Sequence, residues 1–397
     1  MIEYEEALEA VLSKSPALQT EAVELLAAGN RVLANSIVAD RDYPPFERAT
    51  MDGFALRAET FRPGIEYRVR GTVLAGRVWK GKIDSDCVEI TTGAAVPEGA
   101  NAVIRVEDSR SDGNGRVHFE CHDVKAWQNV ARRGEDARGG ELLLEKGQLV
   151  DHAVISVLAS VGVAQPEVYV RPRVSIISTG DEVIPVDETP GPVEIRNSNA
   201  PALLYMLSAL GIQGSSVHVR DTPEQLEAAI ATMLRTSDVL ILTGGVSKGS
   251  RDLVGAALEQ AGVRKVFHGV RMKPGKPVWF GRHDSEGVFV FGLPGNPYSV
   301  QATFRLLVEP LVRSFESLKP RPSLFLPLRG DRNRSSSGRA DFFPARVWTG
   351  PEGTMIEGMQ HNGSGDIRAC LASTGLGRHP ANRESLSDGE LVEYFAW

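Results

Sequence analysis

The chain has 397 residues, a length typical of about two to four domains. Apolar residues make up 42% and charged residues 24%, an ordinary globular balance, and the formal net charge is −7. This acidic balance argues against a non-specific nucleic-acid-binding protein, which needs a basic face. It does not exclude a local basic pocket for an anion.

The cysteines and the N-terminus indicate a reducing compartment. Cys87, Cys121 and Cys370 are too far apart in sequence for a CxxC pair, so we expect free thiols and neither a zinc site nor a disulfide framework. The N-terminus is acidic and amphipathic and lacks the features of a signal peptide. The longest weakly polar run, 153–164, is too short to span a bilayer. We therefore expect a cytoplasmic protein with no membrane association.

The N-terminal part is predicted to be helical over residues 2–38, because apolar residues recur near helical spacing, with a break at Ser15 and Pro16. Adjacent prolines exclude a regular helix over 41–48. A second helical stretch is predicted over 151–161.

Between these helical stretches, from about Thr50 to Glu135, short β-rich pieces alternate with glycine turns and predict a small β-domain. Residues 111–116 (SDGNGR) are typical of a hairpin turn. Because helical pieces flank it in sequence, we expect the β-domain to be an insertion into a helical region.

The centre of the chain, from Arg171 to Pro310, alternates strands and helices. Near-continuous apolar strands alternating with helices predict a parallel sheet covered on both faces. The predicted strands are 174–180, 215–221, 238–245 and 287–295, and the predicted helices are 199–210, 223–236, 252–262 and 296–314. Beyond Pro320, further β-like pieces predict a C-terminal β-barrel or sandwich.

Three of the predicted strands end in segments that suggest a site, since ligands of open α/β sheets bind beyond the carboxyl ends of the strands. They are STGDE (178–182), TGGVSKGSRD (243–252) and GLPGNP (292–297). The hydroxyls and carboxylates of the first favour a ligand or metal site, and a turn with solvated acids is the alternative. The prolines of the third fix the direction of the loop amides, and a purely structural turn is the alternative.

The second segment has the character of an anion-binding loop. Its glycines let backbone N–H groups face an anion at a helix start, and Ser247 and Ser250 can donate to phosphate oxygens. Asp252 would repel a phosphate, so its natural partner there is a divalent cation such as Mg²⁺. The alternative is that Asp252 caps the following helix.

Other segments are weaker signals on their own. Lys273 and Lys276, held between prolines, form either a local positive site or a solvated loop, and spacing does not decide between them. Asp52-Gly53 and the segment RRGED (132–136) are ordinary turn or surface sequences when each is taken alone.

Taken together, eight segments resemble the molybdopterin molybdenumtransferase family, known as MoeA in bacteria and as the E-domain of gephyrin in animals. They occur in the family's order and spacing over nearly the whole chain, with a looser match in the C-terminal domain. They are PPFERATMDGFALR (44–57), TTGAAVPEGANAVI (91–104), ARRGEDA (131–137), STGDEV (178–183), RNSN (196–199), TGGVSKGSRD (243–252), MKPGKP (272–277) and GLPGNP (292–297).

The resemblance implies an α/β multidomain fold with a central parallel, MogA-like molybdopterin-binding domain. An elongated helical region, a β-roll inserted into it and a C-terminal β-barrel complete the family's architecture. The corresponding segments are a helical region over 1–45, the inserted β-rich domain over 46–136, the second part of the helical region over 137–170, the α/β domain over 171–317 and the β-barrel over 318–397.

The resemblance also implies a transferase. Enzymes of this family use Mg²⁺ and molybdate to insert molybdenum into adenylylated molybdopterin, releasing AMP and forming molybdenum cofactor. They are homodimers whose site is shared between subunits. A molybdopterin adenylyltransferase and molybdoenzyme acceptors are the implied partners, with no nucleic acid and no membrane.

The family's site residues carry over onto matching positions. Its functional acids fall on Asp52, Glu182, Asp221 and Asp252, and the last three of these are the implied metal ligands. The implied substrate-binding residues are Thr92, Asp136, Thr179, Gly180, Thr243, Gly244, Gly245, Ser247, Lys273, Lys276, Pro294, Gly295, Asn296 and Pro297. Arg339 and Ser364 are further candidates for oxyanion contacts.

The chain departs from the family's pattern at a few positions. Glu47 and Arg48 replace the usual Asp and Asn, and Lys248 and Arg251 add positive charge near the phosphate loop. These differences could tighten anion binding or signal an altered substrate. Three alternative functions also stay open: a molybdopterin adenylyltransferase, which shares the α/β domain, a tungsten-inserting paralogue, since the two oxyanions are nearly the same size and charge, and a non-catalytic scaffold like gephyrin. The roughly 170 residues before the centre argue against the first, and the retained acids argue against the last.

Overall fold

The computed structural model describes residues 1–14, 16–245, 253–335, 338–351 and 353–397. The chain forms two compact units. One contains Met1–Glu21 and Tyr169–Trp397, and the other contains Ala22–Val168. None of the helices in the described ranges has the length and apolarity that crossing a bilayer requires.

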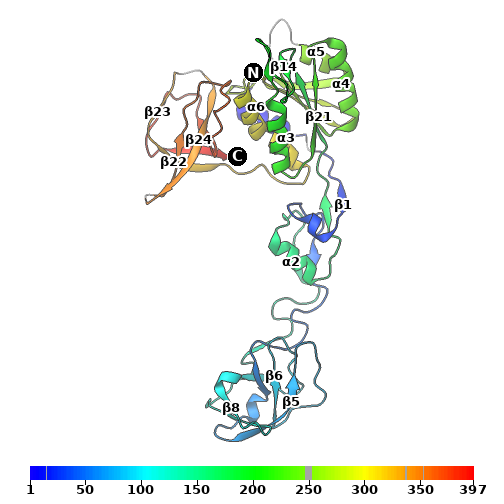
Figure 1. The fold of residues 1–397 in the computed structure, drawn as a ribbon, viewed down its shortest axis with the longest axis vertical. Coiled ribbons are helices and arrows are strands. Elements are labelled where there is room, and N and C mark those ends of the chain that lie inside the picture. The colour runs from blue at the N-terminus through cyan, green and yellow to red at the C-terminus, as the bar shows by residue number, and fades with distance from the viewer. Residues whose placement is uncertain (15, 246–252, 336–337, 352) are drawn as a thin grey trace. The chain divides into compact units, whose positions relative to one another are not determined.

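The larger unit is built on a six-stranded sheet with the order β16-β13-β17-β21-β20-β18 (Figure 1). The first four strands are parallel, as the apolar strand pattern predicts, and the last two pair antiparallel. The prediction had not included these last two strands, and their antiparallel pairing makes the sheet mixed. The strands are β13 (Val174–Thr179), β16 (Gly214–Val219), β17 (Val239–Thr243), β18 (Val263–His268), β20 (Trp279–His283) and β21 (Val288–Leu293).

Helices cover both faces of this sheet (Figure 1). Adjacent strand residues point to opposite faces, so Ile176 packs in the core beneath α3 and α6, while Ile177 packs beneath α4 and α5. The predicted central helices are confirmed. They are α3 (Asn199–Ala209), α4 (Pro223–Thr236), α5 (Leu253–Gln260), and α6 (Pro297–Thr303), which continues through a π-helical turn (Phe304–Val308) into α7 (Glu309–Ser314).

The N-terminal helix is much shorter than predicted. α1 spans only Tyr4–Leu12, so the prediction of helix over 2–38 is wrong. Pro16 cannot donate within a helix, and the apolar residues after it form β1 (Thr20–Ala22) and a 3₁₀ turn at Leu25–Ala28. Tyr4, Ala7 and Val11 pack α1 into the core of the larger unit.

The C-terminal part of the larger unit is a barrel. Five strands close on themselves because β24 pairs with both β25 and β26. The short β19 (Met272–Lys273) adds to β24 and so joins the barrel to the loop that follows β18. The barrel strands are β22 (Leu324–Arg329), β24 (Ala340–Gly350), β25 (Gly353–Gly358), β26 (Gly375–His379) and β28 (Leu391–Ala396), with β23 (Arg332–Asn333) and β27 (Ser385–Leu386) forming a separate pair.

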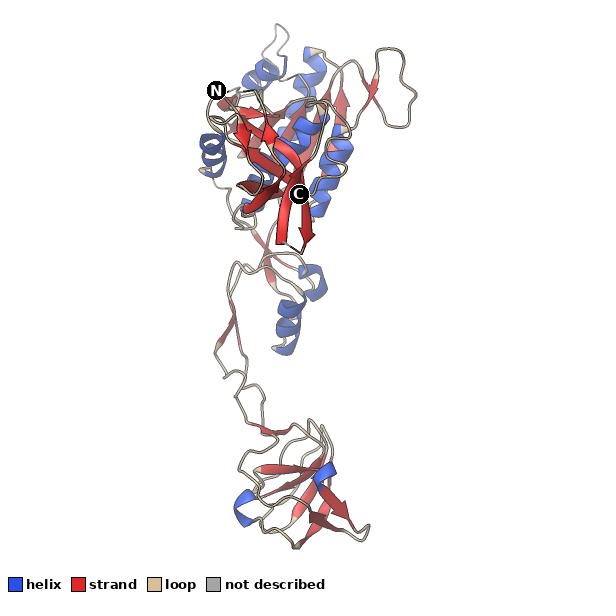
Figure 2. Ribbon diagram, turned by 90° about the vertical axis from the view of Figure 1, so that its left-hand side faces the viewer, coloured by secondary structure: helices blue, strands red, loops and turns tan. Residues whose placement is uncertain are grey.

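The smaller unit holds a six-stranded sheet of order β7-β4-β6-β5-β9-β8. Its strands are drawn in red in Figure 2. The predicted hairpin at 111–116 is confirmed, because Asp112 Oδ1 accepts from the backbone N–H groups of Asn114 and Arg116. The sheet strands are β4 (Gly53–Leu56), β5 (Glu66–Val73), β6 (Cys87–Ile90), β7 (Ala102–Arg105), β8 (Ser109–Ser111) and β9 (Arg116–Phe119).

Shorter elements complete the chain. The predicted helix over 151–161 is confirmed as α2 (His152–Ser160), which Asp151 caps by accepting from the N–H of Val154. The remaining elements are β2 (Ile37–Val38), β3 (Arg48–Ala49), β10 (Val130–Ala131), β11 (Leu142–Leu144), β12 (Glu167–Tyr169), β14 (Val183–Ile184), β15 (Ile195–Arg196) and 3₁₀ turns at Ala58–Thr60 and Val106–Asp108.

Candidate active site

The loops after β13, β17 and β21 meet at one edge of the central sheet. The N–H of Gly244 donates to the carbonyl of Leu293 at 3.3 Å. A methyl group added at Gly244 would lie 2.7 Å from the carbonyl oxygen of Thr179, and one at Gly295 would lie 3.7 Å from the Cα of Gly244. The three glycine-containing turns singled out from the sequence are therefore packed together, and the closest approach leaves no room for a side chain.

Buried hydroxyl groups lie at these strand ends. Ser178, Thr179 and Thr243 are all buried, and within the described residues the hydroxyls of Ser178 and Thr179 have no hydrogen-bond partner. A methyl group on Gly245 would lie 3.2 Å from Thr179 Oγ1, so this hydroxyl borders the glycine turn. Unpartnered buried hydroxyls are costly, and a polar ligand would satisfy them.

Acidic side chains gather at the ends of β13 and β16. The N–H of Asp221 donates to Asp181 Oδ1 at 3.2 Å, and the carboxylate of Glu182 lies close to Gly180. Burial, followed by the charges of Asp181 and Glu182, raises the pKa of Asp221. A cation held here would relieve this repulsion.

The predicted metal set is only partly described. Glu182 and Asp221 lie at neighbouring strand ends, but the described residues contain no group of three or more His, Cys, Asp or Glu that could hold a metal ion. Asp252 and Ser247 lie outside the described residues.

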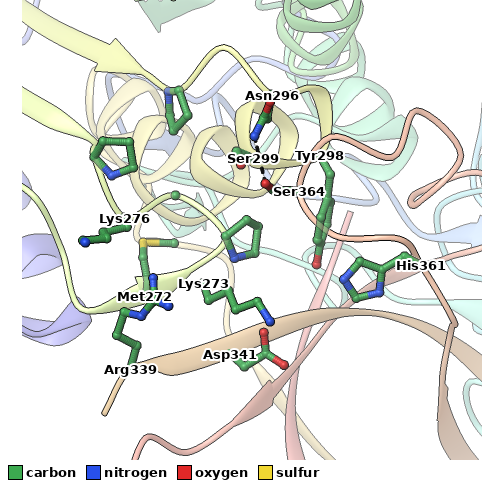
Figure 3. A pocket seen from close by; sticks show the side chains of 14 residues that line it. Met272, Lys273, Lys276, Asn296, Tyr298, Ser299, Arg339, Asp341, His361 and Ser364 are labelled. Atoms are coloured by element: carbon green, nitrogen blue, oxygen red, sulfur yellow. Dashed lines mark hydrogen bonds between the residues drawn. The ribbon is translucent and has the colours of Figure 1, made fainter. Parts of the chain in front are cut away.

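Beyond β21, the chain forms a cavity of about 250 Å³, here called the basic cavity (Figure 3). Its positive side chains, Lys273, Lys276 and Arg339, form no ion pair within the part of the chain that the structure describes. The amide of Asn296 donates to Ser364 Oγ at 2.8 Å across its wall (Figure 3). The lining residues are Met272, Lys273, Pro274, Gly275, Lys276, Pro277, Pro294, Asn296, Tyr298, Ser299, Arg339, Asp341, His361 and Ser364.

Three loops hold this cavity in shape. Asn199, at the start of α3, donates to the carbonyl of Gly295 at 2.7 Å, and Tyr298 N–H donates to the carbonyl of Ser364 at 3.2 Å. Pro297 occupies the first turn of α6, where proline is tolerated. The predicted residues Lys273, Lys276, Pro294 and Asn296 thus line one cavity, and Arg339 and Ser364 line it as well.

Asp341 and His361 were missed from the sequence. Asp341 is buried and pairs with Arg332, whose Nη2 lies 3.1 Å from Asp341 Oδ2. The ring of His361 packs edge-on against Tyr298, with centroids 5.3 Å apart. The only sequence signal for Asp341 was a charge at the start of an otherwise apolar strand, ADFFPA, and the sequence carried no comparable signal for His361.

The smaller unit brings two predicted residues together. Asp52 Oδ1 accepts from the N–H of Thr92 at 2.6 Å and from its hydroxyl at 2.9 Å. These two bonds lower the pKa of Asp52. Gly53 is required beside it, because a methyl group there would lie 1.9 Å from the carbonyl of Ile104. Asp136 has an exposed side chain and is held through its N–H, which donates to the carbonyl of Tyr43 at 2.9 Å.

The chain matches known proteins over its whole length. Three family profiles match it: "MoeA N-terminal region (domain I and II)" over 2–162, "Probable molybdopterin binding domain" over 175–314 and "MoeA C-terminal region (domain IV)" over 330–397. A molybdopterin molybdenumtransferase from Synechococcus elongatus is 33% identical over 99% of both chains, and one from Haemophilus influenzae is 30% identical over 99% of this chain and 98% of that one.

The fold agrees with this match. The crystal structure of a molybdopterin biosynthesis MoeA protein from Pyrococcus horikoshii is 30% identical, covers 100% of both chains and superposes with a TM-score of 0.84. The fold, the glycine turns at the strand ends and the full-length similarity lead to one conclusion: the chain belongs to the molybdopterin molybdenumtransferase family.

Proposed function

We propose that this chain inserts molybdenum from molybdate into adenylylated molybdopterin and releases AMP. The observation that carries the proposal is the basic cavity beside strand ends with clustered acids and with hydroxyls that have no partner among the described residues. Molybdate is an oxyanion that needs positive donors, and a pyrophosphate link needs groups that tolerate its charge. The family relationship supports this pairing of substrates.

Lys273, Lys276, Arg339 and Ser364 are the proposed molybdate contacts. Their cationic and hydroxyl groups line one cavity, and the lysines and arginine are not committed to an acid within the described residues. Charge-assisted bonds of this kind are worth about 1.5–3 kcal/mol each. The cluster would hold molybdate while the pterin reaches it from the neighbouring loops.

The glycine turns after β13, β17 and β21 are the proposed cradle for the pterin and its phosphates. Gly244 and Gly245 have φ of +92° and +63°, conformations that leave backbone N–H groups uncovered by side chains. The hydroxyls of Thr179 and Thr243 border this turn, and Gly180, Pro294, Gly295, Asn296 and Pro297 complete the same edge. Ser247 belongs to this proposed set as well.

Glu182, Asp221 and Asp252 are the proposed ligands of Mg²⁺. The raised pKa of Asp221 supports a cation there, since Asp181, Glu182 and Asp221 form no ion pair within the described residues. When bound, Mg²⁺ would neutralise phosphate charge as the phosphoanhydride opens. Our proposal includes a homodimer in which Asp52, Thr92 and Asp136 of one subunit complete the site of the other.

The activity is tested by AMP release from adenylylated molybdopterin with Mg²⁺, with and without molybdate. We expect release only when molybdate is present. Lys276→Met should raise the molybdate KM roughly tenfold or more, because one charge-assisted contact is lost. Lys265→Met is the matched control, since Lys265 pairs with Glu259 on the surface. Molybdate-independent release, or none at all, would refute the proposal.

The shared site is tested by mixing two variants, Asp52→Ala and Asp221→Ala, at an Mg²⁺ concentration too low for either variant alone to release AMP at an appreciable rate. If each site draws on both subunits, half of the mixed dimers' sites regain all their acids, and activity should return to about a quarter of the wild-type rate. A mixture as inactive as its components would count against the shared site. Size-exclusion chromatography with light scattering should give the mass of a dimer for both variants.

A further inference from the structure

A second polar cavity lies in the C-terminal barrel, and no sequence motif pointed to it. It encloses about 380 Å³ and is here called the barrel cavity. Its walls come from the segment that joins β22 to β23 and from the end of β25. The lining residues are Leu328, Arg329, Gly330, Asp331, Arg332, Asn333, Gly358, Met359, Gln360 and His361.

The barrel cavity and the basic cavity share a wall. His361 lines both of them, and it lies beside Tyr298 at the edge of the basic cavity (Figure 3). The ion pair between Arg332 and Asp341 crosses the same boundary, since Arg332 lines the barrel cavity and Asp341 the basic one. One imidazole ring and one ion pair therefore stand between the two spaces.

The arginines of the barrel cavity are held in place by stacking on aromatic rings. The guanidinium of Arg332 lies 3.9 Å from the ring centre of Phe343, and its buried Nε has no partner within the described residues. The guanidinium of Arg329 lies 4.6 Å from the ring centre of Trp348. Stacked guanidinium groups keep their in-plane N–H donors for a ligand.

The other polar groups of this cavity also favour an anion. The side-chain amides of Asn333 and Gln360 are exposed and have no hydrogen-bond partner in the described ranges. The single carboxylate, Asp331, is already engaged by the backbone N–H of Asp388 at 2.9 Å. Because the guanidinium of Arg332 already pairs with Asp341, the guanidinium of Arg329 and the two amides are the main donors left for a small tetrahedral dianion.

We propose that the barrel cavity is an outer binding site for a tetrahedral oxyanion, from which molybdate passes His361 into the basic cavity. This inference rests on the proposed function only for the identity of the anion. Burial, together with the charges of Arg332 and Lys273, lowers the pKa of His361, so its imidazole is uncharged near pH 7. An uncharged imidazole does not hold a passing dianion as a further cation would.

The proposal is tested by equilibrium dialysis of the full chain against molybdate, and in separate arms against sulfate and inorganic phosphate. We expect two classes of molybdate site in the wild type. Arg339→Ala should weaken the class in the basic cavity roughly tenfold, because one cation is lost, and Gln360→Glu should weaken the other roughly tenfold, because a new carboxylate repels the dianion. Gln213→Glu, an exposed substitution of the same chemistry elsewhere in the unit, is the control and should change neither class.

Kinetics give a second readout. Gln360→Glu should raise the molybdate KM for AMP release roughly tenfold while kcat changes less, because the outer site affects supply of the anion. A single class of site in the wild type, or equal behaviour of Gln360→Glu and Gln213→Glu, would overturn the inference. Equal affinity for sulfate and phosphate would overturn its assignment to molybdate. Absence of AMP release with two intact classes of site would refute only the proposed function.

Discussion

Gly244 makes the closest backbone approach among the strand-end loops, and another glycine of the same unit provides its control. Gly244 has φ +92°, and an added methyl group would lie 2.7 Å from the carbonyl of Thr179. Gly287, just before β21, has φ +72° but nothing within 4 Å of such a methyl group. Alanine at either position enters the left-handed region, which costs about 1–2 kcal/mol. Only at Gly244 must the neighbouring backbone also move, which adds about 1–3 kcal/mol.

We therefore expect Gly287→Ala to lower the free energy of unfolding by about 1–2 kcal/mol and Gly244→Ala by about 2–5 kcal/mol. Urea denaturation monitored by tryptophan fluorescence measures the free energy of unfolding of both variants, and the comparison holds when their m-values are equal. Gly244→Ala should also slow AMP release, because it separates the loops of the proposed cradle, while Gly287→Ala should not. Equal losses of stability in the two variants would show that φ alone, and not the close approach, requires glycine at Gly244.

Two further predictions concern charge. Glu309 is buried and accepts two hydrogen bonds from Arg321, so Glu309→Ala should lower the free energy of unfolding by about 3–5 kcal/mol. Glu259→Ala, which breaks an exposed ion pair of similar length, should lower it by less than about 1 kcal/mol. Urea denaturation compares the two variants, and similar losses would contradict the role of burial. Because burial and neighbouring acids raise the pKa of Asp221, the folded chain binds its proton more tightly than the unfolded chain, and ionisation destabilises the fold. Asp221→Asn should therefore raise the melting temperature at pH 7 without divalent ions, and the gain should disappear below about pH 4; a gain that grows on acidification would have the wrong sign.

Strong apolar patterns made most of the central fold predictable. The four parallel strands are apolar on both faces because helices cover both faces, and this leaves a continuous signal in the sequence. β18 and β20 were not predicted, since Arg264, Lys265 and Arg282 interrupt their apolar pattern at an edge of the sheet. The helix over 2–38 was wrong because apolar spacing alone does not distinguish a helix from short strands and turns.

Part of the candidate site was likewise predictable from the sequence, and part was not. Glycine turns at strand ends are local features, so the sequence places them correctly, and the structure packs them together. Asp341 reaches the basic cavity only because β19 pairs with β24, which sets it opposite Lys273 in register. Such a pairing joins segments about 70 residues apart, and no local pattern records it.

The order of the strands suggests how the proposed reaction is divided across the sheet. The acids lie at the ends of β16 and β13, the glycine turn follows β17, and the basic cavity lies beyond β21. Neighbouring strands are about 4.8 Å apart, so the two outer positions are separated by about 14 Å, a span that suits an elongated pterin nucleotide. A ligand lying across this edge would meet the proposed cation at one end and the oxyanion at the other.

This division predicts two separable kinetic defects. Asp221→Ala should raise the Mg²⁺ concentration needed for half-maximal AMP release by about tenfold or more while the molybdate KM stays near its original value. Arg339→Ala should raise the molybdate KM by about tenfold while the Mg²⁺ requirement stays near its original value, because it removes a cation from the basic cavity and leaves the acids intact. Titrating each ion at saturating levels of the other measures both effects. If either variant shifted both parameters equally, the two ions would have to occupy one common site, and the separation across β13, β17 and β21 would be wrong.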